Sequence, residues 1–189
     1  MAKVFRTIDH KTKEFFARKR TEGLLQALPP GVVEYGEKWV QSRPLLVPKH
    51  VSPCFVRGKI DTVLKLDDGS WAVVDFKTGE RKSEHMSLYS RQLHAYAIAL
   101  ENAAPGMLEL RPIKKLGLLV FEPDAFRNAP LGPAALLGSM TWIEIPRDDE
   151  GFLAFLSEVL DVLESTEPPA GSPTCEWCNY RAKARQTGL

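Results

Sequence analysis

The sequence predicts a single α/β domain in which helices flank a central mixed β-sheet. Apolar stretches of helical and of strand-like pattern alternate along the chain. The 189 residues, of which 44% are hydrophobic, suffice for one full hydrophobic core. We expect residues 1–167 to form this domain and residues 168–189 to form a C-terminal tail with a Cys-x-x-Cys motif.

The expected elements follow in order from the N-terminus. Residues 9–28 read as a helix that Asp9 can cap and that Pro29-Pro30-Gly31 ends. A strand is expected within 32–47. The later elements are strands at 55–66 and 71–77, a helix at 84–101, a strand at 116–121, a loop or short helix at 123–138, a strand at 140–145 and an amphipathic helix at 148–164.

The charge is almost balanced, with 25 basic and 24 acidic side chains and a net charge of +1. This excludes a histone-like polycation and restricts any nucleic-acid site to a local patch. Three basic clusters are candidates, although each can equally be a solvated helix face. They are Lys11, Lys13, Arg18, Lys19 and Arg20; Arg81 and Lys82; and Arg181, Lys183 and Arg185.

The sequence also predicts the compartment. No apolar run is long enough to span a bilayer, and the N-terminus lacks the apolar core of a signal peptide. Three cysteines argue against a disulfide scaffold and for a reducing compartment. We therefore expect a soluble, cytoplasmic protein.

The strands at 55–66 and 71–77 are expected to pair as a hairpin around Asp67-Asp68-Gly69. In that register Asp61 opposes Asp75, and opposed residues share a face of the sheet. Lys77, two residues beyond Asp75, shares this face. The hairpin therefore brings two carboxylates and one ammonium group together.

The same register divides the hairpin into two faces, unless a β-bulge shifts it by one residue. Even-numbered positions in 56–66 and 72–76 would form an apolar face. Odd-numbered positions would place Arg57 and Lys59 beside the two aspartates.

Two carboxylates that converge at a strand end need a positive group between them. Mg²⁺ suits such a place because it takes one or two carboxylates, keeps several waters and binds substrate phosphate. The alternative is a surface ion pair between Asp75 and Lys77. Asp75, however, closes the near-continuous apolar run 71–74, which favours a buried site.

Three stretches together resemble a known family. They are Gly58-Lys59-Ile60-Asp61, then Val73-Val74-Asp75-Phe76-Lys77-Thr78-Gly79, and Gln92-Leu93-His94-Ala95-Tyr96. In this order they resemble the G-x-x-D, (D/E)-x-K and Q-x-x-x-Y motifs of the PD-(D/E)XK nucleases, in particular the RecB-like exonuclease branch. The resemblance implies a restriction-endonuclease-like core and a Mg²⁺- or Mn²⁺-dependent nuclease that hydrolyses phosphodiester bonds in DNA.

The resemblance implies roles for the residues of these motifs. Asp61 and Asp75 would bind the metal, and Lys77 would assist the attacking water. Thr78, directly after Lys77, is a candidate for substrate binding.

Gln92 and Tyr96 are implied to approach the substrate or to brace the site. Tyr89, Gln92 and Tyr96 occupy positions i, i+3 and i+7 and so share one helix face. A packed polar edge of the helix is the alternative for all three.

A further metal ligand is implied by the H-x-x-x-E pattern with which this branch often opens. His10 and Glu14 match it, although the glycine usually seen before the histidine is missing. An exposed histidine is the alternative for His10, and His50 is a second candidate.

Some relatives carry a four-cysteine iron–sulfur cluster, of which Cys175-Glu176-Trp177-Cys178 resembles the C-terminal start. Such a cluster usually needs four thiolates, and three cysteines argue against it. Structural zinc through Cys175 and Cys178 is possible. We expect a remnant without metal.

The functional prediction is a deoxyribonuclease, preferably an exonuclease on single-stranded DNA or DNA ends. The alternatives are a module on the same fold that binds nucleic acid or a partner without cutting, and a ribonuclease or tRNA-targeting enzyme. The sequence has no G-x-x-x-x-G-K-[ST] motif, so a helicase or recombination protein would have to unwind long duplexes.

Overall fold

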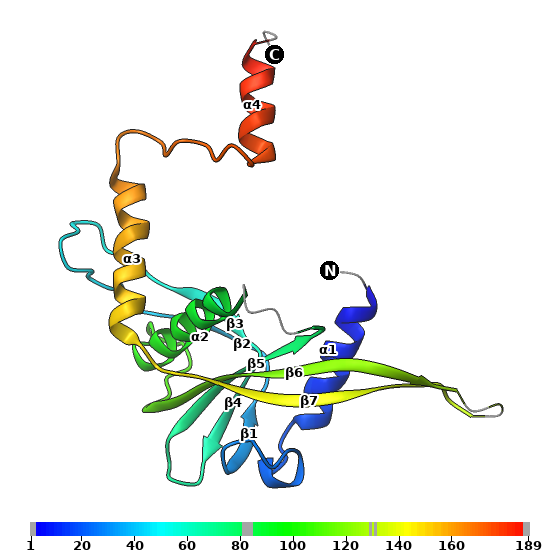
Figure 1. Cartoon of the computed structure of the whole chain (residues 1–189). Helices are drawn as coiled ribbons and strands as arrows, with labels where there is room; N and C mark the ends of the chain where they lie inside the picture. Colours follow the sequence, from blue (N-terminus) through cyan, green and yellow to red (C-terminus); the bar gives the residue numbers. More distant parts are fainter. Residues whose placement is uncertain (1–2, 81–84, 129, 131, 187–189) are drawn as a thin grey trace.

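A computed structural model gives the fold and describes residues 3–80, 85–128, 130 and 132–186 (Figure 1). The elements in chain order are α1 (Lys3–Phe16), the 3₁₀ helix η1 (Thr21–Gly23), β1 (Gly31–Tyr35), β2 (Lys38–Gln41), β3 (Arg57–Ile60), β4 (Thr62–Leu66), β5 (Trp71–Thr78), α2 (Met86–Glu101), β6 (Ile113–Arg127), β7 (Ala135–Ile145), α3 (Asp149–Glu164) and α4 (Glu176–Gln186).

Five strands form a mixed central sheet in the order β1-β4-β5-β6-β7. Neighbouring strands are antiparallel except for β5 and β6, which are parallel and are joined through α2. Strands β2 and β3 form a separate antiparallel pair. The predicted mixed α/β fold with helices flanking a central sheet is confirmed.

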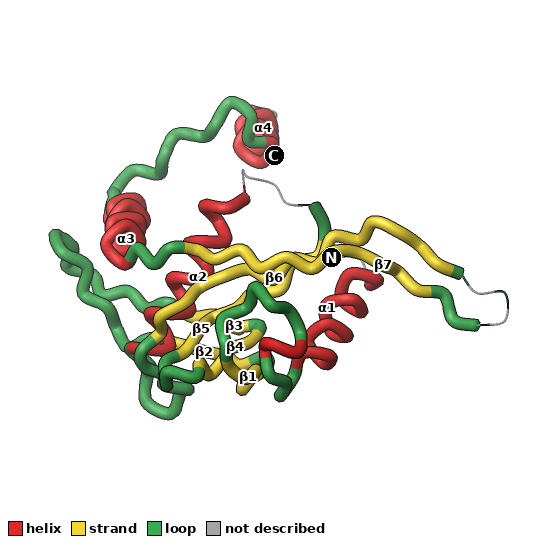
Figure 2. The backbone as a smooth tube through the Cα atoms, turned by 60° about the horizontal axis from the view of Figure 1, so that its bottom comes forward, coloured by secondary structure: helices red, strands yellow, loops and turns green. Residues whose placement is uncertain are grey.

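The central strands are buried on both faces, which explains the near-continuous apolar sequence of β5. Figure 2 shows α1 and α2 on opposite sides of these strands. The cluster on the α2 side includes Val63, Val73, Leu93, Leu100 and Leu118. The cluster on the α1 side includes Phe16, Leu64, Leu66, Val74 and Phe76. The even-numbered residues of β4 and β5 thus form one apolar face, as predicted.

The first helix differs from the prediction of a helix at 9–28. It begins at Lys3 and ends at Phe16, so Asp9 lies inside it and caps nothing. Arg18 takes a left-handed conformation, with φ 60°, and its N–H bonds the carbonyl of Val33 (3.0 Å). This pairing with the edge of β1 replaces the helical hydrogen bonds that periodicity alone predicted.

The single strand predicted within 32–47 is two strands in different sheets. The chain leaves β1 after Tyr35 and enters β2 at Lys38. Gly36 and Glu37 lie between them. Glu37, which lies in this break, contacts Lys13 and Lys59 and thereby becomes part of the site described below.

The segment 123–138 was predicted as a loop or short helix, and this is wrong for most of it. Strands β6 and β7 pair as a long antiparallel ribbon that extends past α1 (Figure 1). The register shifts between Pro123 and Ala125, where proline cannot donate to the ladder. Pairing along the ribbon satisfies the backbone and overrides the weak local preference of this composition.

Helices α2 and α3 agree with the segments predicted at 84–101 and 148–164. Asp148 caps α3 by accepting from the N–H of Gly151 (2.8 Å). Residues 81–84, with the basic pair Arg81 and Lys82, lie outside the described residues.

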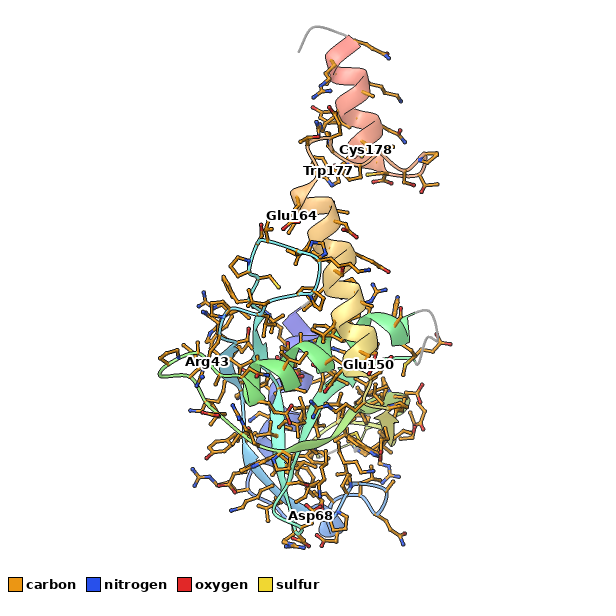
Figure 3. All side chains as sticks on the ribbon, turned by 90° about the vertical axis from the view of Figure 1, so that its left-hand side faces the viewer. Arg43, Asp68, Glu150, Glu164, Trp177 and Cys178 are labelled. Atoms are coloured by element: carbon orange, nitrogen blue, oxygen red, sulfur yellow. The ribbon has the colours of Figure 1, made fainter. Side chains whose placement is uncertain are left out.

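The predicted tail contains helix α4, none of whose residues is buried. Figure 3 shows Cys178 and Trp177 at the base of α4, beyond the end of α3 at Glu164. A domain boundary at residue 167 stays a prediction. Among the described residues, no helix has the length and apolar character needed to cross a membrane.

Candidate active site

The chain bends between β3 and β4, and this bend places Asp61 beside β5. The pairing of Thr62 with Val74 continues the register in which Asp61 faces Asp75. The Asp61 side chain accepts a hydrogen bond from the backbone N–H of Phe76 (Oδ2, 2.9 Å). This hydrogen bond fixes the Asp61 carboxylate next to Asp75, the residue that precedes Phe76.

Asp75 is a buried acid, with 2% of its surface exposed. Its Oδ1 accepts from Gln92 Nε2 (3.2 Å), and Lys77 Nζ lies 2.5 Å from its Oδ2. This oxygen is buried and, beyond its ion pair with Lys77, has no hydrogen-bond partner in the described part of the chain. It therefore keeps unused capacity to bind a further positive group.

Burial raises the pKa of Asp75 to about 6. The Lys77 ammonium group acts in the opposite direction, the negative charge and hydrogen-bonding contact of Asp61 add to the effect of burial, and the pKa of about 6 is the net result. Lys77 alone therefore does not compensate for two neighbouring carboxylates.

The carboxylate oxygens of Asp61 and Asp75 are suitable ligands for a divalent cation. Asp75 Oδ2 lacks a hydrogen bond and lies beside a second carboxylate that raises its proton affinity. Across the described ranges, no group of three or more His, Cys, Asp and Glu side chains is arranged to hold a metal ion. Two carboxylates are enough for Mg²⁺, which keeps several of its waters.

Three charged residues that the motifs did not identify form an ion-pair cluster with Asp61, centred on Lys13. Lys13 Nζ contacts Asp61 Oδ1 (2.7 Å), Asp9 Oδ2 (2.8 Å) and Glu37 Oε1 (3.0 Å). Burial acts to lower the pKa of Lys13, but its hydrogen bonds with the three carboxylates prevail and raise it above the usual range. Asp9 and Lys13 are spaced i, i+4 in the sequence, which could have shown that they are neighbours on one face of α1.

The residues of the third motif lie around Asp75. Gln92 Nε2 also donates to the Tyr96 hydroxyl (2.9 Å), which braces Gln92 against Asp75. A Cβ at Gly58 would lie 2.6 Å from Tyr96 Cε1, so the glycine of the first motif makes room for the tyrosine of the third. Lys77 Nζ lies 4.6 Å from the centre of the Tyr89 ring.

Thr78 lies at the end of β5 and pairs with Phe121 of β6. It lines a small pocket of about 60 Å³ together with Lys77 and Tyr89. The four candidate substrate-binding residues therefore lie on β5 and α2, where Gln92 contacts Asp75, Tyr96 contacts Gln92, and Thr78 and Tyr89 line a pocket with Lys77.

Arg57, predicted beside the acids, packs instead over the ring of Trp39 at 5.0 Å. Lys59 pairs with Glu37, which also contacts Lys13, and so lies at the edge of the charged cluster that includes Asp61. Ile60, predicted on the apolar face, joins the cluster on the α2 side instead. The bend at Asp61 explains these errors, because β3 leaves the plane of β4 and its alternation no longer continues that of the hairpin.

His10 is exposed, and no hydrogen bond or ion pair among the described residues connects it to Asp61 or Asp75. Glu14 is also exposed and pairs with Lys11 (2.8 Å). His50, the second candidate ligand, bonds Ser157 and Glu164 of α3 at 2.7 and 3.0 Å. His50 therefore anchors α3 and does not approach the acids.

The three cysteines are free. The N–H of Cys178 donates to Cys175 Sγ (3.4 Å), which lowers the pKa of Cys175. Cys54 packs with the apolar residues that hold α3, including Phe152. The two motif cysteines therefore form a local turn at the start of α4.

A pocket of about 630 Å³ adjoins Asp61. Its walls come from the end of α1 and from β1 and the turn after it, and they carry three basic side chains: Lys13, Arg18 and Lys38. Tyr35 and Gly36 also line it. Glu34 is an acidic residue of the lining besides Asp61, so a phosphate could approach Asp61 beside Arg18 and Lys38.

Comparison of the chain with known proteins identifies its family. The sequence profile described as the PD-(D/E)XK nuclease superfamily matches residues 3–183. Curated proteins gave no match. A solved structure described as "Crystal structure of SSO0001" is 20% identical, with a TM-score of 0.40 over 76% of this chain and 57% of that chain. The chain thus spans little more than half the length of that solved chain.

Proposed function

Because the chain belongs to the PD-(D/E)XK nuclease superfamily, we propose that it is a Mg²⁺- or Mn²⁺-dependent deoxyribonuclease that hydrolyses phosphodiester bonds. We further propose exonuclease action on single-stranded DNA or DNA ends, as the resemblance to the RecB-like branch implies. A helicase or recombination protein as its partner stays a prediction.

One observation carries the proposal: Asp61 and Asp75 converge beside Lys77, and a buried oxygen of Asp75 is left without a hydrogen bond in the described part of the chain. A surface ion pair between Asp75 and Lys77 would not need a 2%-exposed carboxylate. The burial of Asp75 has a free-energy cost, and a site that uses the carboxylate for binding accounts for that cost.

Each residue of the site would have a separate role in hydrolysis. A bound divalent ion would supply charge neutralisation and an acidified water. Asp61 and Asp75 would hold the ion, and Gln92 would keep Asp75 oriented. Lys77 would direct its ammonium group at the water or at the scissile phosphate.

His10 is the least supported of the proposed ligands, since it is exposed while its neighbour Asp9 points to Lys13. We propose it only as a ligand that would complete the metal site on DNA binding. In a complex with DNA and Mn²⁺, His10→Ala should then weaken Mn²⁺ binding. Unchanged binding would remove His10 from the site.

The test is cleavage of end-labelled linear DNA by the purified chain with Mg²⁺ or Mn²⁺. Lys77→Ala should abolish cleavage while the circular dichroism spectrum stays that of the wild type. Lys115→Ala is the matched control, because Lys115 is also a strand lysine paired with an acid, Glu144, but is more exposed than Lys77 and pairs in register with Ala72 rather than with Asp75. Full activity of Lys77→Ala would refute the mechanism.

Substrate type is resolved in the same assay. Circular single-stranded DNA should resist cleavage if the enzyme needs an end. A competing RNA of the same sequence should inhibit weakly if DNA is the substrate. Cutting of the circle would contradict exonuclease action, and preferential cutting of the RNA would favour a ribonuclease.

A further inference from the structure

We propose that Lys13 is a second lysine of the active site, which competes with the divalent cation for Asp61 and, once released, binds a DNA phosphate in the adjoining pocket. This inference rests on the proposed nuclease function. It concerns a residue outside the three sequence motifs, on helix α1.

The contacts of Lys13 mirror those of Lys77. Lys77 Nζ lies 2.5 Å from Asp75, and Lys13 Nζ lies 2.7 Å from Asp61. The Lys13 side chain is 14% exposed and also contacts Asp9 and Glu37. The two facing acids are therefore flanked by two ammonium groups, one from β5 and one from α1.

Competition follows from how the oxygens of Asp61 are used. Its Oδ2 accepts the N–H of Phe76, and its Oδ1 contacts the ammonium group of Lys13. A divalent ion that binds Asp61 must share a carboxylate with a positive charge only 2.7 Å away. Repulsion between the two cations favours departure of the flexible lysine.

The pocket of about 630 Å³ next to Asp61 has room for the Lys13 side chain after its release. Lys13 already lines it, together with Arg18 and Lys38. Glu37 keeps a partner in Lys59 when Lys13 leaves, so the cost of the movement is reduced. With Lys13 released from Asp61, the basic side chains of this lining outnumber its acidic ones, Asp61 and Glu34, and can contact the phosphates that flank the cleaved bond.

The experiment measures Mn²⁺ binding by calorimetry in the absence of DNA, for the full-length wild type and for Lys13→Met. We expect Lys13→Met to bind Mn²⁺ at least about tenfold more tightly, because a unit charge a few ångströms from a divalent ion is removed. Lys13→Arg keeps the charge and should bind Mn²⁺ within about threefold of the wild type. Lys11→Met is the control, since Lys11 lies on the same helix but pairs with the exposed Glu14.

A second measurement distinguishes a role of Lys13 in DNA binding from a purely structural role. In cleavage assays at saturating Mn²⁺, Lys13→Met should raise the KM for DNA by about tenfold, the usual effect of one lost charge-assisted hydrogen bond. Tighter metal binding combined with weaker DNA binding is not expected from a fold defect. Lys13→Gln, read in the same way, replaces Lys13→Met if the latter fails to fold.

Unchanged or weaker Mn²⁺ binding in the folded variants would overturn the competition. Tighter Mn²⁺ binding with an unchanged KM would overturn the phosphate contact. If the variants bind Mn²⁺ more tightly but the wild type cuts no DNA, the proposed nuclease function fails and the competition stands.

Discussion

Phe76 donates its backbone N–H to the carboxylate of Asp61 at 2.9 Å, so the strand that carries the second acid also holds the first. Asp75 directly precedes Phe76 in β5. One hydrogen bond therefore fixes the relative position of the two carboxylates more tightly than the turn of the hairpin could. The predictions below follow from this arrangement and from the packing behind it.

Asp61→Asn should preserve the fold and remove the activity. An amide oxygen can still accept from Phe76, but the negative charge that binds a cation is lost. We expect the rate of DNA cleavage to fall by at least about a hundredfold, since charge stabilisation by a metal is worth several kcal/mol. Calorimetry should show weakened Mn²⁺ binding, and a melting temperature near that of the wild type is the control. Retained cleavage would contradict a ligand role for Asp61.

Asp75→Asn should change the pH dependence of stability. The pKa of Asp75 in the folded chain is raised from 3.8 to about 6, so the folded state holds its proton more tightly than the unfolded state. The stabilisation from the protonated acid is complete below about pH 4 and is lost as pH rises through about 6. Without metal, the wild type should lose on the order of 3 kcal/mol from this group between about pH 4 and about pH 7.5.

Urea unfolding in EDTA checks this prediction. The amide introduced by Asp75→Asn cannot ionise, so the gain in stability of this variant over the wild type should be larger at about pH 7.5 than at about pH 4.5. Added Mn²⁺ should then stabilise the wild type more than the variant. A gain that is independent of pH would show that burial does not disfavour the Asp75 carboxylate.

Gly58→Ala should displace Tyr96. The added methyl group would lie 2.6 Å from Tyr96 Cε1, which forces the ring to move and costs about 1–3 kcal/mol of stability. Because Tyr96 accepts from Gln92, and Gln92 donates to Asp75, cleavage should also slow by about tenfold. Gly23→Ala is the matched control, since a Cβ there meets nothing within 4 Å. Equal stability of the two variants would refute the contact.

His94→Ala should affect stability and leave the chemistry intact. His94 is buried inside the Gln92–Tyr96 motif, but its Nδ1 bonds the carbonyl of Ser90 and its Nε2 accepts the N–H of Asp148, both at 2.7 Å. The ring thereby joins α2 to the start of α3. We expect a loss of about 2–4 kcal/mol in chemical unfolding, with kcat within about threefold of the wild type at a temperature where both are folded. A selective loss of kcat would place His94 in the site.

The local sequence predicted the centre of the fold well. The turn 67–69 fixed the pairing of β4 with β5, and this pairing puts Asp61 opposite Asp75. The helix of Gln92 and Tyr96 followed from periodicity. These features depend on contacts between residues close in the chain, where spacing and register carry most of the information.

Features that depend on distant partners were missed. The bend at Asp61 turns Arg57 toward Trp39, and the ribbon of β6 and β7 extends through a segment whose composition favours a loop. Lys13 meets Glu37 and Asp61 across 24 and 48 positions of sequence. Apart from the i, i+4 spacing of Asp9 and Lys13, nothing in the local sequence distinguished Lys13 and Glu37 from surface charges.

The sequence by itself therefore determined which acids and which lysine of β5 share a strand face, because antiparallel pairing across a short turn leaves one register. Only the tertiary structure decided how deeply Asp75 is buried, which of its oxygens has no hydrogen-bond partner beyond the Lys77 ion pair in the described part of the chain, and that a lysine from α1 contacts Asp61. Burial and long-range ion pairs depend on how α1, α2 and the sheet pack together, and this packing is the sum of many weak contacts that no single motif encodes.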